Sequence, residues 1–306
     1  MVQQRPGVIP PRPGPPPRRT SRRTILLRRA LALTVLAALV GFGVWLAYAA
    51  TREGGGESAA PTQITSIRRV PDFRVIFPEG FTRAEMAKRV QAVAKIAQRK
   101  RKVKPKLSSK SYLAATRPRR IPGFGATKRS LEGFLFPATY NFTAKTTSAK
   151  LAHDQLKAFR DNWKQVDLRY ARLKNLTPYD VLIIASMVER EALAPDERPL
   201  IAAVIYNRLR NGMPLGIDAT LRYGLGIPGT KSIRQSQLQS SSPYNTRNRT
   251  GLPPTPIANP GLASLQAAAH PARVKYLYFV RKPDKVHHFF TSSYRAFQNY
   301  ANAHGY

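Results

Sequence analysis

The stretch VLIIASMVEREA, residues 181–192, is an apolar run that ends on two glutamates, Glu189 and Glu191. Thr177 precedes it as a favourable helix cap and is followed by a proline, while Asp180 falls in the predicted first turn, beside the positive end of the helix. The stretch is therefore predicted to be a buried helix around which the rest of the fold is organised.

A carboxyl group at the end of an apolar helix is poorly solvated, which favours its neutral form and raises its pKa. Helical geometry places Glu189 on one face with Leu182 and Ser186, and it rotates Glu191 about 200° away from that face. Glu189 is thus expected to be the better shielded of the two and is the first candidate for a general acid. The alternative is a structural role, in which a helix-end glutamate pairs with a nearby arginine.

The other acidic residues can be weighed one by one, because the chain has only 16 of them. Most fall in a linker, in a turn, on solvated or capping positions of helices, or in an N-terminal module that includes Glu79. Those that remain as candidate acids are Glu132, Glu189, Glu191 and Asp218.

Composition narrows the classes of partner and site. The 306 residues carry 51 Lys and Arg, and the net charge of +35 implies a polyanionic neighbour such as nucleic acid, anionic lipid or cell-wall polymer. The absence of cysteine excludes disulfides and thiolate metal sites. The five histidines lack metalloprotease spacing, so no bound metal is expected.

The N-terminal part predicts a membrane anchor. Residues 1–29 form a Pro/Arg-rich tail expected to be disordered, and residues 30–51 are 22 uncharged residues, enough for a transmembrane helix. Arginines crowd the N-terminal side of this span, which places the tail in the cytoplasm and the rest of the chain outside. A cleaved signal peptide is the competing interpretation, although the apolar stretch exceeds a usual signal core. Export excludes nucleic acid in either case.

Beyond a linker at residues 52–72, the predicted elements favour an α+β fold over a doubly wound sheet, since strands are expected only as local hairpins. A long loop rich in Pro, Gly and Asn, residues 241–261, is expected to be functional. The sequence predicts a strand and turn at 73–82, helices at 83–98, 109–116, 148–167, 178–189, 196–211 and 264–270, and a hairpin from 274–282 and 287–293.

Six motifs in order along residues 70–300 make the chain resemble the YceG-like (MltG) endolytic murein transglycosylases. They are PEGFT at 78–82, LEGFLFPATY at 131–140, ASMVERE at 185–191, AAVIYNRLRNGMPLGIDATLRYGLG at 202–226, SPYNTRNRTGLPPTPIANPG at 242–261 and AAAHPARVKYLYFV at 267–280.

The resemblance implies a small LysM-like α+β module that binds wall glycan, followed by a larger α+β catalytic domain. We place the module and a basic connector at residues 73–129, and the catalytic domain at residues 130–306. Glu189 matches the family's catalytic glutamate. Residues expected to contact glycan are Asn207, Asp218, Thr220, Tyr223, Tyr244, Asn245, Thr246 and His288. The alternative for each is a local structural role.

The implied activity is non-hydrolytic cleavage of the β-1,4 bond between N-acetylmuramic acid and N-acetylglucosamine, with no cofactor. Its partners would be peptidoglycan glycan strands and the cytoplasmic membrane, with cell-wall synthases as further candidates. The rival class is a non-catalytic wall-binding or divisome scaffold, in which the basic surface binds the polymer. That class predicts a lost acid, whereas Glu189 is present.

Overall fold

A computed structural model describes residues 73–306, all within a compact unit that spans Arg68–Tyr306. The predicted tail, membrane span and linker, residues 1–72, lie outside the described residues. Within residues 73–306, no helix has both the length and the apolar character needed to cross a bilayer.

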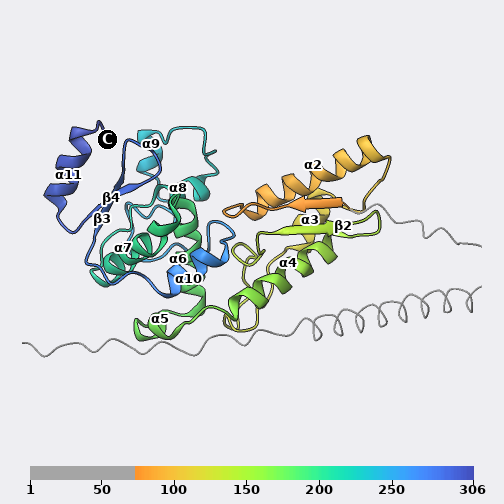
Figure 1. Ribbon diagram of the computed structural model, residues 1–306, viewed down its shortest axis with the longest axis horizontal. Helices are drawn as coiled ribbons and strands as arrows, with labels where there is room; N and C mark the ends of the chain where they lie inside the picture. The colour runs from red at the N-terminus through yellow and green to blue at the C-terminus, as the bar shows by residue number, and fades with distance from the viewer. Residues whose placement is uncertain (1–72) are drawn as a thin grey trace, which may run out of the picture. The chain divides into compact units, whose positions relative to one another are not determined.

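The first four elements form a small α+β arrangement in the order strand, helix, helix, strand (Figure 1). They are β1 (Phe73–Ile76), α2 (Arg83–Arg101), α3 (Ser109–Ala115) and β2 (Thr139–Phe142). β1 and β2 pair antiparallel, with Phe73 opposite Phe142. α2 begins at a capping box, in which Thr82 and Glu85 satisfy each other's backbone N–H groups.

The β1–β2 pair corrects the expectation that strands occur only as local hairpins, because both helices α2 and α3 lie between its strands in the chain. Strand β2 was missed, since TYNF is too short to show a period of two and its partner is far away in sequence. The pair also links the two sides of the predicted domain boundary at residue 129, and that boundary stays a prediction.

Helix α4 (Ser148–Trp163) packs beside α3 (Figure 1). The rest of the structure is a helical body with a hairpin and a last helix at its C-terminal end. Its elements are α5 (Arg169–Leu173), α6 (Pro178–Glu191), the 3₁₀ turn η1 (Pro195–Glu197), α7 (Arg198–Arg210), α8 (Asp218–Leu225), α9 (Gln235–Leu238), α10 (Leu262–Ala269), β3 (Tyr278–Arg281), β4 (His288–Thr291) and α11 (Tyr294–Ala303). The fold is thus a mixed α+β fold, as the sequence predicts.

Helix α6 is the buried centre of this body. Tyr179 and every residue from 181 to 188 are buried, and the helix packs against α7 and α10 (Figure 1). Its first turn is closed by the capping box between Thr177 and Asp180, with Pro178 at the first position. A helix that is apolar on all sides is stable only inside a core. The burial of α6 confirms the prediction of a buried helix from the sequence.

Several predicted boundaries differ from the structure. The helix expected at 148–167 ends at Trp163, and the one expected at 196–211 divides into η1 and α7. The helices α5, α8, α9 and α11 were not predicted. Each buries at most two residues, whereas the predicted helix α10 buries five, so their sequences carry little of the apolar pattern of a buried helix. The hairpin of β3 and β4 and the irregular loop at 241–261 are confirmed.

Candidate active site

Glu189 lies in the last turn of α6, where the helix emerges from the core, and its side chain is half-buried. Its Oε2 atom accepts a hydrogen bond of 3.0 Å from the backbone N–H of Gly261. Gly261 is the N-cap residue of α10. The carboxylate is therefore held at the positive end of a second helix, which fixes its orientation.

The turn that follows β1 approaches this carboxylate from the N-terminal module. Gly80 lies against Glu189, so that a Cβ added to the glycine would be 3.6 Å from Cγ of the glutamate. The Arg190 side chain donates a 3.1 Å hydrogen bond to the Gly80 carbonyl. The module and the end of α6 thus meet at one place.

The same turn carries Glu79, whose carboxylate lies against the backbone of Gly261. Burial raises the pKa of Glu79, the negative charge of Glu189 raises it further, and Arg198 opposes both effects. Sequence reasoning set Glu79 aside as part of the N-terminal module. Its place in the PEGFT motif was the signal that could have marked it.

Glu191 is turned towards α8 rather than towards Gly261. Burial raises its pKa, the nearby Asp218 raises it further, and Arg281 and the N–H of Ala219 oppose the shift. Both Glu189 and Glu191 are half-buried, so the structure does not support the expectation that Glu189 is the better shielded of the two. What distinguishes Glu189 is its contact with Gly261.

Glu132 is the most deeply buried of the candidate acids and joins three parts of the chain. Its Oε1 accepts hydrogen bonds from the N–H of Arg83 (2.8 Å) and the amide of Asn259 (2.9 Å), and its Oε2 accepts one from the Tyr223 hydroxyl (3.1 Å). Burial raises the pKa of Glu132 to about 7, although these hydrogen bonds oppose the shift. Because Glu132 bonds Asn259, in the loop that bears Gly261, and Arg83, after the turn that bears Glu79, its role is to hold these segments together.

A pH dependence of stability follows from Glu132. The folded-state pKa of about 7 exceeds the unfolded value of 4.5, so the folded protein holds the Glu132 proton more tightly than the unfolded chain does. The contribution of this proton to the free energy of unfolding is complete below pH 4.5 and is lost as pH rises through 7. The Glu132→Gln variant keeps an acceptor and gains a donor towards Tyr223. In the wild-type protein, the free energy of unfolding should decrease by a value on the order of 3 kcal/mol between these pH values, and we expect this decrease to be absent from the variant in urea unfolding.

The contrasting variant is Glu132→Ala, which leaves three donors without their acceptor and should lower stability at every pH. An unchanged pH dependence in the Glu132→Gln variant would assign the titration to another group.

The two predicted tyrosines lie beside this network. The rings of Tyr223 and Tyr244 meet edge to face with centroids 5.2 Å apart, and the Tyr244 hydroxyl is 2.8 Å from Oγ1 of Thr255. Asp218 is tied instead to Arg247 by an ion pair. Asp218 is thus near Glu191, while Tyr223 is joined to Glu132, and the contacts of these residues with glycan stay predictions.

The other five predicted glycan contacts are buried and make internal hydrogen bonds. Asn207 donates to the carbonyls of Val274 and Tyr276, both at 2.9 Å. The hydroxyls of Thr220 and Thr246 share a hydrogen bond, and Thr246 also accepts one from the N–H of Ile217. Asn245 donates to the carbonyls of Leu238 and Ser240. His288 is paired through Nδ1 with Glu197 at 2.6 Å. Their contacts with glycan stay predictions.

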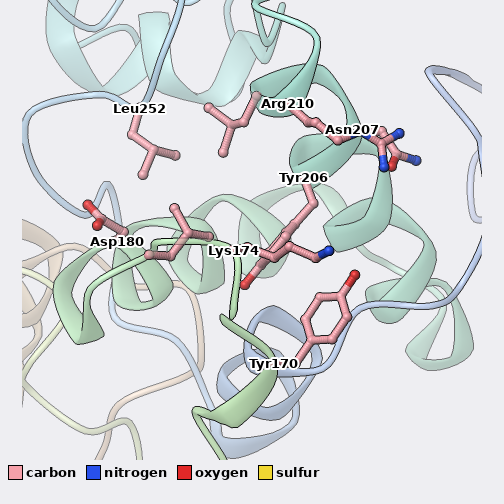
Figure 2. A pocket seen from close by; sticks show the side chains of 9 residues that line it. Tyr170, Lys174, Asp180, Tyr206, Asn207, Arg210 and Leu252 are labelled. Atoms are coloured by element: carbon pink, nitrogen blue, oxygen red, sulfur yellow. The ribbon is translucent and has the colours of Figure 1, made fainter. Parts of the chain in front are cut away.

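A cavity of about 480 Å³ lies near the first turn of α6, lined by Tyr170, Asp180 and Tyr206 among others (Figure 2). Asn207 also lines this cavity. Glu189 does not line the cavity. It lies nine residues after Asp180 in α6, which is about 13 Å along the helix axis. The structure therefore separates Asn207 from Glu189. Within residues 73–306, no three metal-ligating side chains are grouped to hold an ion.

Comparison with known proteins agrees with this architecture. A protein of Bacillus subtilis (strain 168) named endolytic murein transglycosylase is 40% identical over 158 residues, which cover 51% of this chain and 43% of the relative. A Streptococcus pneumoniae protein of the same name is 37% identical over 156 residues, which cover 49% of this chain and 28% of the relative. The matched region is thus less than half of each relative.

A solved structure shows the same fold over a longer range. The crystal structure of a yceG-like protein from Listeria monocytogenes superposes with a TM-score of 0.59 at 27% identity, covering 74% of this chain and 75% of that one.

The fold and site define a mixed α+β protein built around a helix-end carboxylate that the N-cap residue of a second helix holds in place. A model of the YceG-like family matches residues 55–303, and this chain belongs to that family.

Proposed function

We propose that this chain is an endolytic peptidoglycan lytic transglycosylase, with Glu189 as its acid and base. The observation that carries the proposal is the Glu189 carboxylate, half-buried at the end of α6 and oriented by the Gly261 N–H. Family membership and the names of the Bacillus and Streptococcus relatives support the substrate class.

In the proposed reaction, protonated Glu189 gives its proton to the glycosidic oxygen of the N-acetylmuramic acid–β-1,4–N-acetylglucosamine bond. The C1–O4 bond breaks, and N-acetylglucosamine leaves with its 4-hydroxyl restored. The Glu189 carboxylate then takes the proton of the muramic C6 hydroxyl, whose oxygen bonds to C1 and closes the 1,6-anhydro ring. The proton returns to Glu189, so one carboxyl serves both steps and no water is consumed.

The proposed location is the outer face of the cytoplasmic membrane, with a single anchor at residues 30–51 and a cytoplasmic N-terminus. The uncharged stretch and the arginines before it support this topology. The small α+β arrangement of β1, α2, α3 and β2 supports a LysM-like wall-binding role for the N-terminal module. Cell-wall synthases are the proposed protein partners.

The test of this function uses the full chain in detergent with uncrosslinked glycan strands and mass spectrometry of the products. Internal cleavage with 1,6-anhydro ends is the expected result. Reducing ends would show a hydrolase instead, and binding without cleavage would favour the wall-binding scaffold.

A further inference from the structure

Glu79 and Glu189 come from different modules and meet at one glycine. The N–H of Gly261 donates to Glu189, while its Cα faces the Glu79 carboxylate so closely that a Cβ there would overlap that carboxylate. The Glu79 side chain remains exposed to solvent on its other side. The two carboxylates therefore lie close together at Gly261.

Backbone contacts hold the Glu79 turn in this position. The N–H of Gly80 donates to the Asn259 carbonyl at 3.0 Å, and the N–H of Asn259 donates to the Phe81 carbonyl at 2.9 Å. The Arg190 side chain bonds the Gly80 carbonyl. Gly80 has φ +77°, which a residue with a side chain rarely adopts, so this turn depends on glycine.

The charged groups around the two carboxylates come from α6 and α7. Arg190 is directed to the Gly80 carbonyl, and Arg198 donates to the Ser264 hydroxyl at 3.1 Å and faces Glu79. No ion pair of 4.0 Å or less joins Glu79 or Glu189 to a cation within residues 73–306. The negative charges of the two carboxylates repel each other, which together with burial favours the protonated form of Glu79, while Arg198 opposes this effect.

We propose, on the basis of the function proposed above, that Glu79 is a positioning residue of the reaction, which keeps a proton on the Glu79–Glu189 pair before cleavage. The same repulsion acts in the second step. Once Glu189 has given its proton to the glycosidic oxygen, the adjacent Glu79 carboxylate makes it a stronger base for the C6 hydroxyl. The N-terminal module thereby completes the site.

The test is the pH–rate profile of anhydro-end release by full-length Glu79→Gln. Without the negative charge of Glu79, the pH above which kcat falls should move down by about one unit, and kcat at neutral pH should drop about tenfold. KM should change little, because the substitution preserves the size and polarity of the side chain. Glu79→Asp should restore the profile in part.

A second variant moves the Glu79 carboxylate without removing it. Gly261→Ala places a methyl group where that carboxylate lies, keeps the N–H that binds Glu189, and fits the backbone at φ −77°. We expect the same downward shift in pH, and no further loss when it is combined with Glu79→Gln. Asp161→Asn on the exposed face of α4 is the control for a lost negative charge, with an unchanged profile.

Three outcomes decide between the proposals. An unshifted pH profile in both Glu79→Gln and Gly261→Ala, with Glu189→Gln inactive, overturns the role of Glu79 and leaves the proposed function intact. A loss of kcat that is equal at all pH values and accompanied by a lower Tm shows a structural role and also overturns it. An active Glu189→Gln variant refutes the proposed function itself.

Discussion

The Glu189→Gln variant is expected to lose release of 1,6-anhydro ends by about 10²–10⁴-fold, the usual contribution of a general acid–base group. Glutamine can neither protonate the glycosidic oxygen nor accept the C6 hydroxyl proton. Its side-chain oxygen can still accept the N–H of Gly261, so the fold and glycan binding should be preserved. Product analysis by mass spectrometry and a glycan co-sedimentation assay measure the two effects separately.

The matched control is Glu191→Gln, two residues along the same helix and directed towards α8 instead. We expect it to retain most of the activity. The reverse pattern, with Glu189→Gln active and Glu191→Gln inactive, would assign the acid to Glu191, near Asp218.

The second large effect is expected at Asn259, which is fully buried and ties together three segments around the site. Its side-chain oxygen accepts from the N–H of Leu135, and its amide donates to the Phe81 carbonyl and to Glu132, all at 2.9 Å. Asn259→Ala leaves these groups without partners in a buried position. We expect a loss of about 2–4 kcal/mol in the free energy of unfolding.

Such a loss should lower the Tm by roughly 5–15 °C in a thermal melt. Activity should fall as well, because Asn259 precedes Gly261 and its backbone fixes the turn that bears Glu79. The control is Asn162→Ala, which removes a single side-chain hydrogen bond to the Ala158 carbonyl near the surface. Equal Tm values for the two variants would show that the three segments are held by other contacts.

The central helix could be read from the sequence because its determinants are local. The capping box of Thr177 and Asp180 spans four residues, and the apolar run that follows has no polar face to expose. The family, too, could be recognised from six ordered motifs, and the family model confirms it. The position of Glu189 at the end of that helix followed from the same local pattern.

The hydrogen-bond partners of the candidate site residues could not be predicted in this way. Asn207 and His288 are polar residues of a kind found in glycan sites, yet the first supports the chain before β3 and the second is paired with Glu197. The polarity of a residue does not reveal whether its side chain is turned inward, because the exposure of that side chain depends on which elements of the fold cover it.

The sequence by itself determined the buried helix, its cap, the helix-end carboxylates and the family, since each rests on residues close together in the chain or on ordered motifs. Only the tertiary structure decided that Glu79 meets Glu189 at Gly261, and that Glu132 is buried deeply enough to raise its pKa to about 7. The physical reason is that these contacts and this desolvation arise where the N-terminal turn packs on α6 and α10, from segments as far apart as Phe81 and Asn259.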